Sequence, residues 1–120
     1  MFVSYLDAHA PYIPPAPFDR QFPGMNESFD SPRWRQSVMN DVHLLKRSMA
    51  AEERAHMVSQ YDGEIAYLDD RFGKLVARLK QWGIYDNTVI VITSDHGEAF
   101  GERNLVGHAV SVYQTRFMCR

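Results

Sequence analysis

The sequence is poor in the features that mark a disulfide scaffold, a membrane protein or a nucleic-acid-binding protein. It contains one cysteine, Cys119, so no disulfide can form within the chain. Its longest uninterrupted apolar run is Val89-Ile90-Val91-Ile92, far below the ~20 residues that span a bilayer. Thirteen Lys plus Arg stand against fifteen Asp plus Glu, and a net charge of -2 gives no electrostatic footprint for nucleic acid or anionic lipid. We therefore expect neither a membrane span nor a nucleic-acid partner, while the cellular compartment stays open.

The overall composition is that of an ordinary soluble domain. Hydrophobic residues make up 45% and charged residues 23% of the 120 residues, so the chain can bury a core. This length corresponds to one domain at most, and no repeat period divides it. We treat residues 1–120 as one structural unit.

The first thirty residues predict a short strand followed by a long loop. Residues 2–6 are aromatic and branched, which favours a strand that ends at Asp7. Six prolines then fall between Pro11 and Pro32, and proline removes hydrogen-bond donors and fixes φ. A loop of this length in a compact domain is usually functional or disordered.

A long amphipathic helix is predicted from about Ser48 to Trp82. Apolar residues recur at spacings of three or four, which makes one continuous stripe: Met57, Tyr61, Ile65, Leu68, Phe72, Leu75, Leu79 and Trp82. Ser48 is a plausible N-cap, and Gly83 is placed to end the helix. Gly63, a weak helix former, is the weak point of this stripe region.

The helix is followed by a β-branched run, residues 88–93, typical of a strand buried on both faces. A strand, a crossover containing a helix and a second strand predict a right-handed βαβ unit with parallel strands. The predicted fold class is therefore α/β.

Polar side chains follow both predicted strands, and open α/β sheets bind ligands outside the carboxyl ends of their strands. Asp7 and His9 follow the first strand, and Asp95 and His96 follow the second. A carboxylate and an imidazole can together bind one divalent cation if the backbone turns sharply, which Gly97 permits. His108 is a third candidate at the same edge.

Structural roles would also explain several of these residues. Asp95 could instead be the N-cap of a short helix that begins at His96. His9 could pack or hydrogen-bond within the loop. Surface or packing roles are favoured for the remaining candidates, His43, His56, the pair Asp69-Asp70 and Cys119.

Taken together, three segments in this order resemble the sulfatase family of the alkaline-phosphatase-like superfamily. The first is residues 2–12 with the prolines that follow. The second is Tyr61-Asp62-Gly63-Glu64-Ile65 with the rest of its helix. The third is residues 87–98, which end in Ser94-Asp95-His96-Gly97-Glu98. The resemblance implies a partial alkaline-phosphatase-like sandwich, mainly a parallel sheet with flanking helices.

The resemblance also implies roles for individual residues. Asp95 and His96 would be ligands of a single divalent metal, with calcium or manganese the expected ions. His9 would contact sulfate or phosphate oxygens, and His108 stands where family members bind the ester group or its leaving oxygen. The implied function is metal-dependent hydrolysis of sulfate esters.

Two features depart from the family pattern. Many arylsulfatases have Asn in place of His96, whereas Asp-His resembles phosphonate and phosphodiester hydrolases and phosphoglycerol transferases. The family's formylglycine nucleophile arises from a C/S-x-P-x-R motif, which this sequence lacks. We therefore expect a domain truncated at both ends and inactive alone. The alternatives are a fragment of one of those phosphorus-ester enzymes, or a noncatalytic remnant that self-associates through exposed edges.

Overall fold

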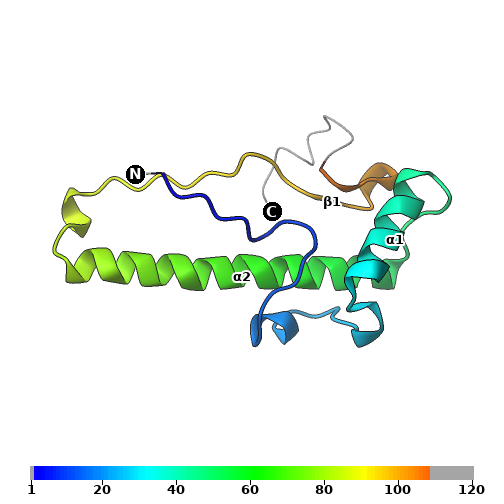
Figure 1. The fold of residues 1–120 in the computed structure, drawn as a ribbon, viewed down its shortest axis with the longest axis horizontal. Helices are drawn as coiled ribbons and strands as arrows, with labels where there is room; N and C mark the ends of the chain where they lie inside the picture. The colour runs from blue at the N-terminus through cyan, green and yellow to red at the C-terminus, as the bar shows by residue number, and fades with distance from the viewer. Residues whose placement is uncertain (1, 109–120) are drawn as a thin grey trace.

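The computed structural model describes residues 2–108, and the long helix α2 dominates it (Figure 1). The main elements are α1 (Pro32–His43), α2 (Ala51–Gln81), β1 (Ala99–Phe100) and β2 (Val106–Gly107). Four single-turn 3-10 helices lie at Phe18–Arg20, Glu27–Phe29, Tyr85–Asn87 and Glu102–Asn104. No helix in residues 2–108 has the length and apolarity needed to cross a membrane.

The predicted long helix is confirmed, but its N-terminal signal is different. The N-cap is Ala50 rather than Ser48, and the side chain of Glu53 accepts a hydrogen bond from the Ala50 amide at 2.9 Å. That bond is the half of a capping box in which a Glu side chain satisfies the backbone amide of the N-cap residue. At the other end Gly83 has φ 68°, and its amide donates to the carbonyl of Lys80 at 3.0 Å. Gly83 therefore ends the helix as predicted.

Helix α1 lies at the end of the region where a loop was expected, and its start carries an ordinary helix signal. The hydroxyl of Ser31 accepts a hydrogen bond from the Trp34 amide at 3.1 Å, and Pro32 occupies the first turn. The apolar residues Trp34, Val38 and Val42 follow at spacings of four, and the latter two are fully buried. Proline at the first helical position starts this helix rather than preventing it.

The proline-rich loop is ordered because it packs against α2. The carbonyl oxygen of Phe18 and the ring of Pro14 lie so close to Gly63 that a Cβ at this position would be 2.6 Å from the oxygen. The side chain of Gln60 also donates to the carbonyl of Asp19 at 2.9 Å. Gly63 is a weak helix former, but its lack of a side chain lets the loop cross close to the helix.

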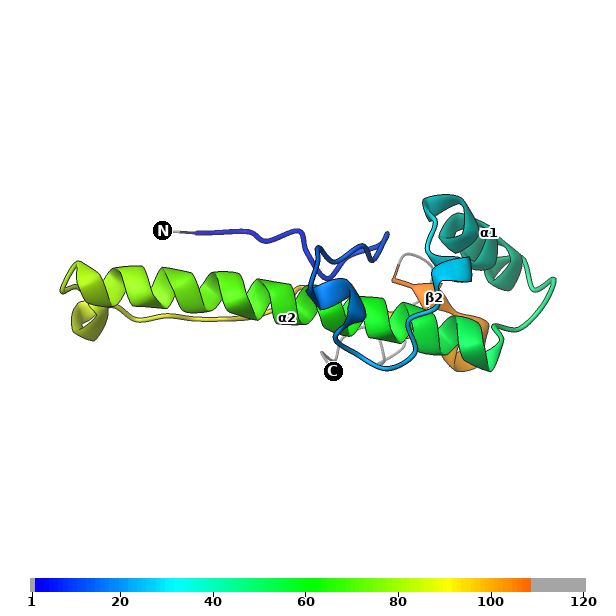
Figure 2. The same cartoon turned by 90° about the horizontal axis from the view of Figure 1, so that it is seen from below.

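One small core joins the loop, both helices and the hairpin. Its buried members are Tyr12, Val38, Val42, Met57, Tyr61, Phe100 and Val106. The rings of Tyr12, Tyr61 and Phe100 pack with centroids 5.1 to 5.5 Å apart. Figure 2 shows β2 between α1 and the N-terminal part of α2. This core fixes the start of the proline-rich loop against the hairpin.

The two predicted strands, residues 2–6 and 88–93, are not formed. Both are extended segments that run in the same direction beside α2 (Figure 1), but the only β-ladder in the described part of the chain is β1 with β2. Residues predicted to be buried are exposed, with Val89 at 90% and Val91 at 82%. A strand needs neighbours to satisfy its backbone groups, and no described segment lies beside these two as a partner.

The sheet that does form is a two-stranded antiparallel hairpin, not the parallel sheet that was predicted. Its strands are joined by residues 101–105, in which Gly101 has φ 97° and Arg103 and Asn104 also have positive φ. The described residues therefore do not form the predicted sandwich.

Candidate metal and anion site

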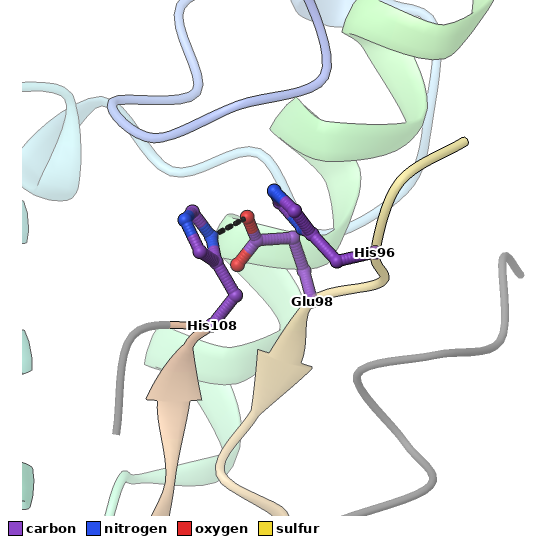
Figure 3. A group of neighbouring side chains, drawn as sticks. All are labelled: His96, Glu98 and His108. Atoms are coloured by element: carbon purple, nitrogen blue, oxygen red, sulfur yellow. Dashed lines mark hydrogen bonds and ion pairs between the residues drawn. The ribbon is translucent and has the colours of Figure 1, made fainter. Parts of the chain in front are cut away.

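The register of the hairpin brings Glu98 and His108 together. Ala99 pairs with Gly107, so the next residues outward on the two chains, Glu98 and His108, face each other at the open end. The Oε1 atom of Glu98 lies 2.7 Å from Nδ1 of His108 (Figure 3). Because a carboxylate oxygen only accepts, Nδ1 of His108 carries the hydrogen of this bond.

His96 extends from the same end of the hairpin. It stands two residues before Glu98, and the period of two in extended chain favours the same side for both. Its ring stacks on that of His108 with centroids 3.8 Å apart and an interplanar angle of 26°. Nδ1 of His96 lies 3.3 Å from the carbonyl oxygen of Gly97, which leaves Nε2 directed elsewhere.

His9 reaches the same place from the loop after residues 2–6. Its ring meets His108 edge-on with centroids 4.9 Å apart, and the centroid of His96 is 6.4 Å away. Nδ1 of His9 donates to the carbonyl of Ala10 at 2.7 Å. The predicted convergence of His9, His96 and His108 is therefore present. In each of the three rings, Nδ1 contacts an oxygen atom of the protein.

Glu98 is the least exposed member of this group. Its side chain is 2% exposed, whereas that of His108 is 28% exposed. The hydroxyl of Tyr12 donates to Oε2 of Glu98 at 3.0 Å. Burial, and then the charge of Glu98, hold the pKa of Tyr12 far above its usual range, so this hydroxyl stays a donor.

Sequence reasoning assigned Glu98 no role, although signals were present. Phe100 and Val106 flank five residues that include Gly101, a pattern typical of a hairpin. A hairpin with that loop pairs residue 98 with residue 108. Parallel-strand reasoning alone could not predict the contact.

Asp95 lies beside the cluster but not within it. Its side chain is 91% exposed, and its Oδ1 is 3.7 Å from Nε2 of His96. The N-cap interpretation of Asp95 is wrong, because residues 96–98 form no helix. Asp95 and His96 can approach one cation from adjacent positions.

The donor set suits a divalent cation. One ligand atom each from His96, Glu98 and His108 lie within 4.8 Å of one another. Imidazole nitrogen with carboxylate oxygen is a set that manganese, iron or zinc accept readily, while calcium prefers oxygen alone. The adjacent pair Asp95 and His96 offers the same two ligand types, so the residues present fit a metal ion, with manganese the better match of the two expected ions.

The loop that carries His9 is held from below by α2. Oε1 of Glu64 accepts a hydrogen bond from the Ile13 amide at 2.7 Å. Burial raises the pKa of Glu64 to about 7, while the Ile13 amide partly opposes that rise. Asp7, the other candidate on this segment, is exposed and outside the histidine cluster.

The other histidines are placed by packing. His56 is fully buried against Phe29 and Trp34, and its Nδ1 accepts from the Asn26 amide at 3.1 Å. His43 contacts the carbonyl oxygen of Val106 through Nε2 at 2.5 Å. Asp69 is exposed and Asp70 pairs with Lys74, as expected of a solvated face. Cys119 lies outside the described residues.

The chain is similar in sequence to known proteins over nearly all of its length. A model of the family described as Sulfatase matches residues 1–116. The "Multifunctional alkaline phosphatase superfamily protein PehA" of Trinickia caryophylli is 29% identical over 127 residues, which cover 89% of this chain and 25% of that protein. A choline-sulfatase of Rhizobium meliloti is 42% identical over 45 residues, or 38% of this chain and 9% of that protein. An endo-4-O-sulfatase of Bacteroides thetaiotaomicron is 39% identical over 46 residues, again 38% and 9%.

No solved structure matches the chain. The chain spans about a quarter of the length of the first of these relatives and less of the other two.

Proposed function

The chain belongs to the sulfatase family, whose fold is α/β and alkaline-phosphatase-like, and from that premise we propose that it carries part of the active site of a metal-dependent ester hydrolase. In this proposal Asp95 and His96 bind one divalent metal, and His9 and His108 contact the oxygens of a sulfate ester. The observation that carries the proposal is the convergence of three histidines from distant segments, His9, His96 and His108.

The metal is proposed to be manganese or calcium. When bound, it would withdraw electron density from the ester oxygens and stabilise negative charge as the ester bond breaks. Asp95 is solvated, so its carboxylate can turn toward the ion without breaking a buried contact. His96 would bind through Nε2, because Nδ1 faces the Gly97 carbonyl.

The two remaining histidines would bind and orient the anion. Each ring would meet the anion through Nε2, because Nδ1 contacts the Ala10 carbonyl in His9 and the Glu98 carboxylate in His108. His9 and His108 lie edge-on, so their rings can meet different oxygens of one tetrahedral group. His108 is then placed to contact the leaving oxygen through Nε2.

The nucleophile is proposed to be a formylglycine that this chain does not contain, since no C/S-x-P-x-R motif occurs in it. The 120 residues alone should therefore show no sulfatase or phosphatase turnover. Measurable turnover that His96→Ala abolishes would contradict this part of the proposal.

A phosphorus ester is the second candidate substrate. The supporting observation is the Asp95-His96 pair, since many sulfatases have Asn after the aspartate. A phosphonate or phosphodiester hydrolase, or a phosphoglycerol transferase, would use the same four side chains. Isothermal titration with sulfate and with phosphate in the presence of Mn²⁺ separates the two: sulfate should bind more tightly, and tighter phosphate binding favours the second candidate.

The metal assignment is tested by calorimetric titration of the chain with Mn²⁺ and with Ca²⁺. We expect one weak site, because only two protein ligands are assigned. Asp95→Ala and His96→Ala should each lower the Mn²⁺ affinity by about 10-fold or more. Asp69→Ala, an exposed carboxylate on α2, is the matched control and should change nothing. Unchanged affinity in both site variants would overturn the assignment.

A further inference from the structure

We infer that Glu98 is the positioning residue for His108, held in place by Tyr12, and that it is not a metal ligand. The inference rests on the proposed anion-binding role of His108 and adds two residues that act through it. Its basis is a chain of three hydrogen-bonded groups, the Tyr12 hydroxyl, the Glu98 carboxylate and Nδ1 of His108, in which the carboxylate is buried.

Each oxygen of Glu98 already has a protein donor. Oε2 accepts from Tyr12 at 3.0 Å and Oε1 accepts from His108 at 2.7 Å. The side chain is 2% exposed, so water cannot replace either contact. Each oxygen keeps a second lone pair, but so little of the side chain is exposed that an ion has little room to approach it without moving Tyr12 or His108.

Gly107 and Tyr12 both flank the carboxylate of Glu98. Gly107 has φ 74°, and a Cβ there would lie at an ordinary contact distance of 3.6 Å from Oε2 of Glu98 and 3.3 Å from the terminal methyl of Met39. Tyr12 is itself fixed, because its ring packs on Tyr61 and Phe100 in the core.

The consequence for His108 is a fixed tautomer and a fixed ring plane. With Nδ1–H donated to Glu98, Nε2 is the nitrogen presented to a ligand, and the ring stacks on His96 in one orientation. Oriented imidazoles of this kind generally owe their orientation to such an acceptor behind the ring.

Nitrogen-15 NMR of the histidine side chains tests the inference on the metal-free chain at about pH 8, above the ordinary histidine pKa of about 6.5. The wild-type chain should show His108 as the Nδ1–H tautomer. Glu98→Ala should return His108 to a mixture of tautomers, whereas Glu98→Gln should keep the Nδ1–H form, because the amide oxygen still accepts. Glu52→Ala, at an exposed position of α2, is the control and should leave the tautomer unchanged.

A metal titration of the same variants separates positioning from ligation. For a positioning residue, Glu98→Gln should change the Mn²⁺ affinity by less than about threefold, a change of under about 1 kcal/mol. A loss of about 10-fold or more would make Glu98 a ligand and overturn the inference. An unchanged His108 tautomer in Glu98→Ala, with the chain still folded by circular dichroism, would overturn it as well. The tautomer measurement is made without metal and does not depend on Asp95 or His96, so the proposed metal site can fail while the positioning role of Glu98 stands.

Discussion

The imidazole of His9 meets that of His108 edge-on with ring centroids 4.9 Å apart, although the two residues lie near opposite ends of the described chain. The contact follows from the core, where Tyr12 from the first loop packs against Phe100 of β1. His9 is close to Tyr12 along the chain, and the hairpin register places His108 opposite Glu98, at the start of the strand that contains Phe100. Packing of two aromatic rings therefore assembles the candidate site.

Tyr12→Phe should destabilise the chain while keeping its core volume. The substitution removes a donor to the buried Glu98 carboxylate, and hydrogen bonds to charged groups contribute about 1.5 to 3 kcal/mol. Urea denaturation should show a loss in that range. Tyr85→Phe, at an exposed tyrosine, should have no measurable effect, and equal stabilities for the two variants would count against the buried bond.

Two glycines of α2 should respond to alanine in opposite directions. A Cβ at Gly63 would lie 2.6 Å from the Phe18 carbonyl oxygen, whereas a Cβ at Gly73 meets nothing within 4 Å. Gly73→Ala should therefore stabilise the helix by up to about 1 kcal/mol, the usual difference in helix propensity. Gly63→Ala should lower the melting temperature because the loop must move away. A rise in melting temperature for both variants would show that the loop does not pack on the helix.

Ionisation of Glu64 should lower the stability of the chain as the pH rises from about 4.5 to above 7. The pKa of this carboxyl is about 7 in the folded chain and 4.5 when unperturbed, so the folded state binds more protons between these values. Glu64→Gln cannot ionise and should match the wild type at low pH. At about pH 8 it should be more stable by up to about 3 kcal/mol, since one pKa unit is worth about 1.4 kcal/mol.

The matched control for this profile is Glu52→Gln, at an exposed position. The difference between Glu52→Gln and the wild type should not depend on pH. A constant difference for Glu64→Gln too would mean that Glu64 ionises normally in the folded chain.

The exposed apolar segments should make the isolated chain self-associate. Leu6 is 84% and Val91 82% exposed, on extended backbone whose hydrogen-bonding groups are open to another chain. Val91→Lys should shift light scattering toward the monomer. Leu44→Lys, an exposed leucine just after α1, should not, and a monodisperse wild-type monomer would contradict the prediction.

Sequence patterns predicted the parts of this fold that depend on local signals. The spacing from Met57 to Trp82 and the stop at Gly83 were sufficient for α2. The convergence of His9 and His108 was also predicted, although from a parallel sheet that the described residues do not form. The start of α1 at Ser31 and Pro32 was also a local signal, but the many prolines before it favoured the prediction of a loop.

Long-range pairing was the part that sequence patterns could not settle. Residues 88–93 have every local property of a buried strand, but a strand forms only where neighbours accept its hydrogen bonds. The contact between Glu98 and His108 depends on hairpin register, which the loop of residues 101–105 decides. Neither relationship is visible in composition or periodicity alone.

Pulsed electron paramagnetic resonance of the Mn²⁺-loaded chain tests the central claim most directly, because spin-echo modulation reports whether an imidazole nitrogen is bound to the ion. We predict modulation from one histidine in the wild type, its loss in His96→Ala, and its retention in His9→Ala and His108→Ala. Modulation that persists in His96→Ala would contradict the assignment of His96 as the metal ligand. Loss in His108→Ala would instead place the ion within the group formed by His96, Glu98 and His108.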